Sequence, residues 1–170
     1  ARARGTAARR HGLIRVGILV INLRCSQGQV EDEWGKRLRE LLPSDEYETV
    51  EYTVAPDEVE TVRVTLRDWA ARCDLVLTVG ATGLGPRDIT PEATRSILDR
   101  ECPGIAEAIR AHAYAKRPGA ILSRGLAGTI GSCLVVNLRG SIESVEDGMA
   151  VLLPILPEAI EVVRRLAQQH

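Results

Sequence analysis

The fold is decided by the stretch Asp74-Leu-Val-Leu-Thr-Val-Gly-Ala-Thr-Gly-Leu-Gly-Pro-Arg-Asp-Ile-Thr-Pro-Glu-Ala-Thr94, which reads as a strand, a glycine-rich loop and a helix. The aliphatic run at 75–79 stops at a glycine, which is typical of a buried strand in a parallel sheet. Gly80, Gly83 and Gly85 remove three side chains from the loop, so backbone N–H groups can surround an oxyanion such as phosphate. Their spacing matches neither the dinucleotide fingerprint nor the P-loop, so the glycines alone leave a plain strand-to-helix turn as an equal alternative.

A helix is predicted to begin directly after this loop. Thr90 suits the N-cap, Pro91 the first helical position and Glu92 the first turn, so the positive end of the helix dipole points back toward the loop. Asp88 stands between the loop and the cap. A carboxylate there gains from the helix terminus but repels a phosphate, which favours a bridging Mg²⁺ ion.

Length and composition indicate one soluble globular domain. The chain has 170 residues, 45% of them hydrophobic and 26% charged, and no apolar run approaches the roughly 20 residues of a membrane span. The net charge is −1, but four of the 22 basic residues are arginines within residues 1–11; without them, 18 basic residues face 23 acidic ones, a net charge of −5. An acidic body with few aromatic residues argues against a nucleic-acid partner.

Residues 1–11 are rich in arginine and alanine and contain no acidic residue. They fit a disordered tail, a flank added for expression or the remnant of a transit-type extension, and the single domain is expected to span residues 12–170. The cysteines form no C-x-x-C pair and have no neighbouring histidine, so we expect reduced thiols in a cytoplasmic protein rather than a zinc site. They are Cys25, Cys73, Cys102 and Cys133.

The rest of the chain alternates predicted strands and helices. Strands are expected at 13–21, 47–54, 120–122 and 132–137, in addition to 75–79. Helices are expected at 31–42, from 56–58 onward, at 91–99 and at 105–114, with a loop at 22–29 and an interruption at Pro103-Gly104. A last helical region is expected at 145–167, interrupted by Pro154 and Pro157. This order predicts βαβ units with right-handed crossovers, and hence an open α/β sheet whose ligands lie beyond the carboxyl ends of the strands.

Four ordered stretches resemble the motifs of the MoaB/Mog family of molybdenum-cofactor biosynthesis proteins, which includes the G domain of gephyrin. They are the acidic turn Pro56-Asp57-Glu58, the run at 78–94, Ala120-Ile-Leu-Ser-Arg124 with Ala127-Gly128, and Leu134-Val-Val-Asn137 with Gly140-Ser141. The resemblance covers about Ile14 to Leu166, and four ordered motifs are far more specific than one glycine loop.

The resemblance implies a three-layer α/β/α fold with a mostly parallel, molybdopterin-binding-like sheet. It further implies a homotrimer that binds molybdopterin and ATP and catalyses the Mg²⁺-dependent transfer of AMP to molybdopterin, with pyrophosphate leaving. A protein that inserts molybdenum would be a partner of such an enzyme.

The same resemblance assigns roles to individual residues. Asp57 and Asp88 would be the catalytic acids and would hold Mg²⁺. The residues that would bind the pterin, the nucleotide or their phosphates are Gly80, Thr82, Gly83, Gly85, Ser123, Asn137, Gly140 and Ser141. Plainer roles remain open: Asp57 as a helix N-cap, Asp88 as an ion-pair partner of Arg87 or Arg95, Ser123 as a loop hydroxyl and Asn137 as a turn former. Arg124 fits either an anion clamp or a surface ion pair.

Several positions depart from the family pattern. Asn22-Leu-Arg24 replaces Ser-Asp-Ser after the first strand, Trp34 replaces a hydroxyl, and Arg139 replaces proline. Ala81 replaces the second glycine of the loop, and its Cβ disfavours a positive φ. A second hypothesis therefore stands beside the enzyme: a non-catalytic cofactor-binding or scaffold protein with the same fold.

Overall fold

The centre of the molecule is a parallel pair of strands, β3 (Leu75–Val79) and β6 (Cys133–Leu138), in a sheet of six strands. The computed structural model describes residues 12–169, so the predicted basic tail at residues 1–11 lies outside the described residues. The strand order is β2-β1-β3-β6-β5-β4. The other strands are β1 (Ile14–Ile21), β2 (Tyr47–Ala55), β4 (Arg100–Glu101) and β5 (Ala127–Ile130). Four strands run parallel, and β5 and β4 complete one edge in antiparallel pairs, which confirms the predicted open, mostly parallel sheet.

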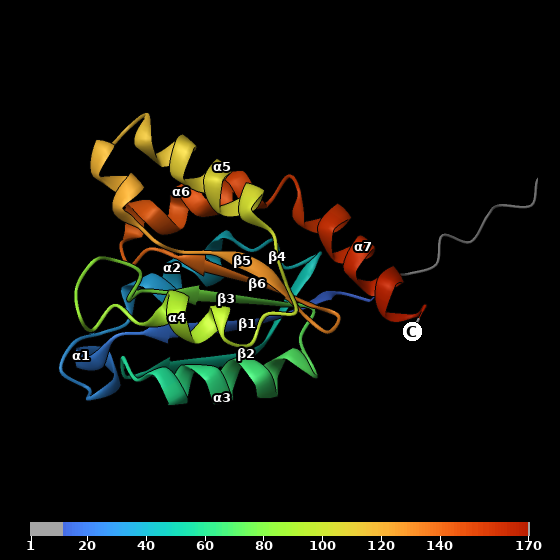
Figure 1. The fold of residues 1–170 in the computed structure, drawn as a ribbon, viewed down its shortest axis with the longest axis horizontal. Helices are drawn as coiled ribbons and strands as arrows, with labels where there is room; N and C mark the ends of the chain where they lie inside the picture. Colours follow the sequence, from blue (N-terminus) through green and yellow to red (C-terminus); the bar gives the residue numbers. More distant parts are fainter. Residues whose placement is uncertain (1–11, 170) are drawn as a thin grey trace, which may run out of the picture.

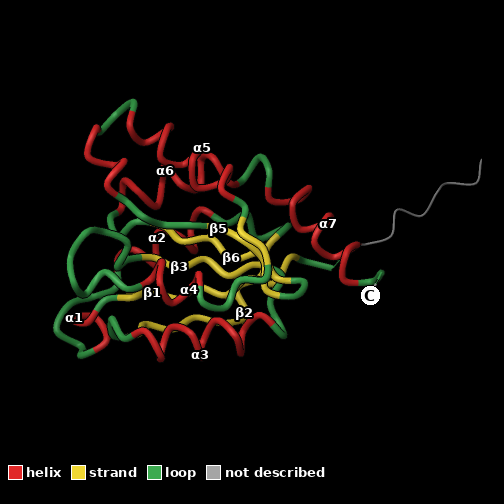
Figure 2. Tube along the Cα trace, viewed as in Figure 1, coloured by secondary structure: helices red, strands yellow, loops and turns green. Residues whose placement is uncertain are grey.

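Helices cover both faces of this sheet, which confirms the three-layer α/β/α architecture. One face packs against α2 (Glu33–Leu41), α5 (Pro103–Tyr114), α6 (Ile142–Leu152) and α7 (Leu156–Ala167), and the other against α3 (Val59–Ala70) and α4 (Thr90–Arg95). Figure 1 shows α5 and α6 on the opposite side of the sheet from α3. Figure 2 shows α1 (Leu23–Ser26) among the loops at one end of the strands.

The aliphatic run of β1 reflects burial on both faces. Val16, Ile18 and Val20 enter one core, whereas Leu19 and Ile21 enter the other, and none is more than 2% exposed. Because successive strand residues point to opposite faces, a strand covered on both sides needs apolar residues at nearly every position.

Two of the predicted boundaries around α4 are wrong. The helix begins at Thr90 and ends at Arg95, four residues before the predicted end. The N-cap is Ile89, because the Thr90 hydroxyl donates instead to the Gly80 carbonyl oxygen at 2.8 Å. The Thr90 hydroxyl therefore forms a tertiary hydrogen bond to Gly80 and does not cap α4.

Four further differences concern short elements. Residues 120–122 belong to a 3-10 helix, η1 (Pro118–Leu122), and not to a strand, and the side chains of Ile121 and Leu122 are more than half exposed. Pro103 and Gly104 begin α5 rather than interrupting the chain, since proline suits the first turn of a helix. Part of the predicted loop at 22–29 forms the short helix α1. The strands β4 and β5 were not predicted, because such short strands show little hydrophobic periodicity in the sequence. Within residues 12–169, no helix is both long and apolar enough to cross a bilayer.

Asp74 ties three elements together at the amino-terminal edge of the sheet. Its carboxylate is 10% exposed, accepts the Arg15 backbone N–H at 2.9 Å and pairs with Arg164 of α7 at 2.7 Å. Burial alone would raise the pKa of Asp74, but the hydrogen bonds from Arg164 and Arg15 outweigh it and place the pKa below its ordinary value.

We expect Asp74→Asn to lower the free energy of unfolding at pH 7 by about 2 kcal/mol, because a charged hydrogen-bonded partner of Arg164 is lost. The folded-state pKa lies below the unfolded value of about 3.9, so this stabilisation is present above that pH and is lost as the pH falls through the folded-state pKa. Urea unfolding at pH 7 and pH 3 measures the effect: the difference between the two proteins should shrink at pH 3. A difference that grows on acidification would contradict the assignment, and Asp68→Asn, on the exposed face of α3, should change little at either pH.

Candidate functional site

The loops that carry the family motifs meet at the carboxyl ends of the parallel strands. The Gly80 N–H, after β3, donates to the Leu138 carbonyl oxygen of β6 at 2.9 Å. The Asn22 N–H, after β1, donates to the Ala55 carbonyl oxygen of β2 at 2.9 Å. Hydrogen bonds between neighbouring strand ends therefore bring all four loops to one edge of the sheet.

The glycine loop, residues 80–88, needs an unusual backbone at its start. Gly80 has a φ of +106°, and a Cβ there would lie 2.4 Å from the Ile21 carbonyl oxygen, so only glycine fits. Ala81 follows with a φ of +55°, and it is the single non-glycine residue with a positive φ in the described part of the chain. The Ala81 carbonyl oxygen accepts the Thr90 N–H at 3.0 Å, so the strained turn is held by α4.

Asp88 lies inside the curve of the glycine loop. The Gly85 N–H donates to Asp88 Oδ2 at 2.8 Å, and a Cβ at either Gly83 or Gly85 would lie 2.9 Å from the same oxygen. The glycines therefore let the backbone approach an oxyanion closely, and in this structure the oxyanion is the carboxylate of the loop itself. Arg87 and Arg95, the alternative ion-pair partners, bind Asp57 and Glu101 instead.

Asp57, in the acidic turn of residues 56–58, is bound across the site to the glycine loop. Arg87 Nε lies 2.7 Å from Asp57 Oδ2, and Arg87 Nη2 lies 3.1 Å from Asp57 Oδ1, which makes the pair bidentate. The residue at the N-cap of α3 is Glu58, so Asp57 does not cap the helix. The acidic turn is thus joined to the glycine loop by a pair between Asp57 and the residue that precedes Asp88.

Ser123 and Arg124 hold the glycine loop from a neighbouring segment. The Ser123 hydroxyl donates to the Thr82 hydroxyl at 3.2 Å, and the Arg124 N–H donates to the Thr82 carbonyl oxygen at 2.8 Å. The Arg124 guanidinium donates to the carbonyl oxygens of Gly83 and Asp88, each at 2.7 Å, and pairs with Glu92. Hydrogen bonding from Arg124 lowers the pKa of Glu92. Arg124 is therefore a brace of the loop, and its nitrogens already have partners.

Asn137 is the buried centre of the site. The side chain is 5% exposed; its Oδ1 accepts the Leu126 N–H, and its Nδ2 donates to the hydroxyls of Thr78 and Thr94 at 2.9 and 3.1 Å. The amide thereby joins β6 to β3 and α4. Both polar atoms of the Asn137 amide thus have partners within the protein. The local sequence, which suggested a turn former, does not predict this structural role.

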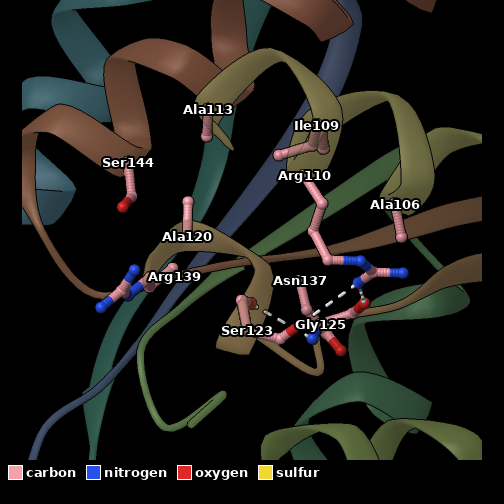
Figure 3. A pocket seen from close by; sticks show the side chains of 10 residues that line it. All are labelled: Ala106, Ile109, Arg110, Ala113, Ala120, Ser123, Gly125, Asn137, Arg139 and Ser144. Atoms are coloured by element: carbon pink, nitrogen blue, oxygen red, sulfur yellow. Dashed lines mark hydrogen bonds between the residues drawn. The ribbon is translucent and has the colours of Figure 1, made fainter. Parts of the chain in front are cut away.

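A small cavity lies between Asn137, α5 and η1. Figure 3 shows Arg110 extending from α5 toward the Ser123–Gly125 turn, where it donates to the Gly125 carbonyl oxygen at 2.7 Å. The space amounts to about 20 Å³, enough for about one water molecule. Its other lining side chains include Arg139, which replaces the family's proline, and Ser144.

Trp34 lies between two of the motif loops. A Cβ at Gly140 would lie 2.7 Å from the Trp34 ring and 3.1 Å from Gly80 Cα, and a Cβ at Gly80 would lie 3.1 Å from the same ring. The indole therefore packs against both glycines and fixes the spacing of their loops. Ser141 is used locally, because its hydroxyl accepts the Ser144 N–H at 3.0 Å and caps α6.

The acids can bind a metal ion only in a restricted way. No three or more His, Cys, Asp or Glu side chains converge within the part of the chain that the structure describes. A divalent ion at either acid would therefore have at most two carboxylate side chains as protein ligands and would need substrate or water oxygens to complete its shell. This donor set suits Mg²⁺, which usually binds through one or two carboxylates and the phosphates of a substrate.

Comparison with known proteins identifies similar chains. The family model described as "Probable molybdopterin binding domain" matches residues 17–158. The chain is 34% identical over 154 residues to the molybdopterin adenylyltransferase of Helicobacter pylori strain J99, with 88% of each chain covered. It is 37% identical over 153 residues to the molybdenum cofactor synthesis protein cinnamon of Drosophila melanogaster, and it spans only 26% of the length of that relative. Among solved structures, the molybdopterin biosynthesis enzyme MoaB of Thermus thermophilus has a TM-score of 0.84 at 44% identity, over 89% of this chain and 96% of that one.

We expect Ala81→Gly to raise the free energy of unfolding by up to about 1 kcal/mol. The change removes the cost of a left-handed φ on a residue with a Cβ, of order 1–2 kcal/mol, and the greater freedom of glycine in the unfolded chain offsets part of that gain. Chemical denaturation measures it, with Ala115→Gly at the end of α5, where φ is −57°, as a control that should destabilise. Destabilisation by Ala81→Gly instead would mean that the packing of the methyl group outweighs the strain.

Proposed function

Because the chain belongs to the MoaB/MogA family of molybdopterin-binding proteins in molybdenum cofactor biosynthesis, we propose that it is a molybdopterin adenylyltransferase. In this proposal it transfers AMP from ATP to the terminal phosphate of molybdopterin with the help of Mg²⁺. The observation that supports the proposal is the pair between Asp57 and Arg87, which joins the acidic turn to the glycine loop at the residue next to Asp88.

Asp57 and Asp88 fit the role of metal ligands, since both offer carboxylate oxygens and Asp57 already binds a cationic group. When bound there, Mg²⁺ would neutralise negative charge on the reacting phosphates. Asp88 would turn from the Gly85 N–H toward the ion, which would free that N–H for a phosphate oxygen. The glycine loop would then keep its conformation and bind a phosphate oxygen in place of the Asp88 carboxylate.

The remaining motif residues would position the two substrates. Backbone groups of Gly80, Thr82, Gly83 and Gly85 would line the phosphates, with Arg124 holding this loop in place. Ser123, Asn137, Gly140 and Ser141 would form the adjoining surface for the pterin and its phosphate. An oxygen of the molybdopterin phosphate would attack the α-phosphorus of ATP, and the bond from that phosphorus to the leaving pyrophosphate would break. Such transfers depend mainly on alignment and charge stabilisation.

A second candidate function is a non-catalytic cofactor-binding or scaffold protein. It is favoured by Trp34, which fills the space between the loops of Gly80 and Gly140 where the family carries a hydroxyl. The internal bonding of Asn137 and Ser141 also leaves fewer free polar groups for a substrate. This candidate predicts binding of molybdopterin and ATP without transfer of AMP.

We further propose that the protein assembles as a homotrimer and passes its product to a molybdenum-inserting partner, on the strength of the family resemblance. Light scattering in solution should give a mass about three times 18.5 kDa. A stable monomer at micromolar concentration would contradict the assembly.

The adenylyl transfer is tested by pyrophosphate release with molybdopterin, ATP and Mg²⁺. We expect Asp88→Asn to lower kcat by at least about 100-fold while the thermal midpoint stays close to that of the unchanged protein, because a charged ligand of the reacting site is removed. Asp68→Asn, far from the glycine loop on α3, is the matched control and should retain full activity. Binding of both substrates by the unchanged protein without detectable transfer would reject the enzyme and support the second candidate.

A further inference from the structure

The Asp57 carboxylate is already occupied by a cation from its own chain. Both of its oxygens face the guanidinium of Arg87, at 2.7 Å for Nε–Oδ2 and 3.1 Å for Nη2–Oδ1. The Asp57 side chain is 12% exposed, and among the described residues no other side chain forms a hydrogen bond or an ion pair with it. Arg87 is therefore the group that balances the charge of this carboxylate in the structure.

The two roles of Asp57 compete with one another. The guanidinium of Arg87 takes one lone pair on each carboxylate oxygen, and its positive charge lies where a divalent cation would approach, so a cation that takes Asp57 as a ligand weakens the pair with Arg87 and favours its departure. The Arg87 side chain is 68% exposed, so it can leave without opening the core. Once released from Asp57, the Arg87 guanidinium must either pair with another anion or be solvated by water.

The glycine loop offers Arg87 a new partner. Arg87 immediately precedes Asp88, whose carboxylate is held by the loop through the Gly85 N–H. A polyphosphate in that loop would lie beside the backbone of Arg87 and would carry more negative charge than one divalent ion neutralises. Guanidinium groups bind phosphate oxygens in the same two-pronged way as they bind carboxylates.

The other nearby arginines are less suited to this exchange. Arg124 donates to the carbonyl oxygens of Gly83 and Asp88, so its departure would release the loop itself. Arg95 pairs with Glu101 at 3.5 Å on the outer side of α4. Arg87 alone among these three is bound to the acid that would coordinate the metal.

We propose that Arg87 is a positioning residue that exchanges partners: it holds Asp57 in the ligand-free protein and binds the polyphosphate once a divalent cation takes Asp57. The identity of the polyphosphate as a nucleotide rests on the proposed adenylyl transfer. The exchange itself requires only a divalent cation and a polyphosphate anion.

The exchange predicts effects of opposite sign in one variant, Arg87→Gln. Without the guanidinium, Asp57 is free, so Mn²⁺ should bind about 3- to 10-fold more tightly in the absence of nucleotide. The same variant should bind α,β-methylene-ATP about 10-fold more weakly, since a charged hydrogen-bonding partner of the phosphates is lost. Free Mn²⁺ is followed by its electron paramagnetic resonance signal, and the nucleotide analogue by titration calorimetry.

Matched variants separate exchange from a structural role. Arg95→Gln removes an equally exposed arginine from the same region and should change neither affinity. Arg87→Lys keeps the positive charge but loses the two-pronged hydrogen bonding of a guanidinium, so its affinities for Mn²⁺ and for the nucleotide analogue should lie between those of the unchanged protein and Arg87→Gln. The inference is overturned if the two affinities fall together in Arg87→Gln, if neither changes, or if Mn²⁺ binds neither protein.

Inorganic pyrophosphate distinguishes this inference from the proposed function. Weaker pyrophosphate binding and tighter Mn²⁺ binding by Arg87→Gln would support the exchange even in a protein that transfers no AMP. Normal adenylyl transfer combined with unchanged affinities in Arg87→Gln would instead keep the function and reject the exchange.

Discussion

The close approach of strand ends at Gly80 is the constraint on which the rest of the site depends. This residue follows β3, donates its N–H to β6 and accepts a hydrogen bond from the Thr90 hydroxyl of α4, while the Ile21 carbonyl oxygen of β1 lies 2.4 Å from where a Cβ would be. Three parallel strands and one helix therefore meet at a residue without a side chain. Any larger residue would separate the strand ends and, with them, the loops that they carry.

Most of the family motif serves this architecture. Arg124 braces the glycine loop, Asn137 joins β6 to β3 and α4, and Ser141 caps α6. Asp57 and Asp88 differ from these residues because their partners are an exposed arginine and one backbone N–H, which a ligand can replace at little cost to the core. Arg124, Asn137 and Ser141 thus hold the site together, whereas the two acids are free to change partners, as the proposed role of metal ligands requires.

The departures from the family pattern have different physical consequences. Ala81 keeps the positive φ that glycine would adopt freely, so the loop retains its path and stores strain instead of moving away. Trp34 adds bulk between Gly80 and Gly140 and makes both glycines sterically necessary. The first change leaves the oxyanion-binding curve intact, whereas the second narrows the space between two loops and is the stronger argument for altered substrate binding.

The sequence by itself determined the parallel β3 strand, the glycine loop, the two-sided burial of β1 and the family, because each depends on local residue pattern. It also predicted which acids would lie near the loop, since carboxyl ends of parallel strands share an edge. Only the tertiary structure decided which partners these side chains have. Arg87 lies 30 residues from Asp57, and Asn137 lies 59 residues from Thr78, and no local pattern encodes such pairs. The short elements β4, β5 and η1 were likewise decided by packing, because two to five residues carry too little periodicity to outweigh their surroundings.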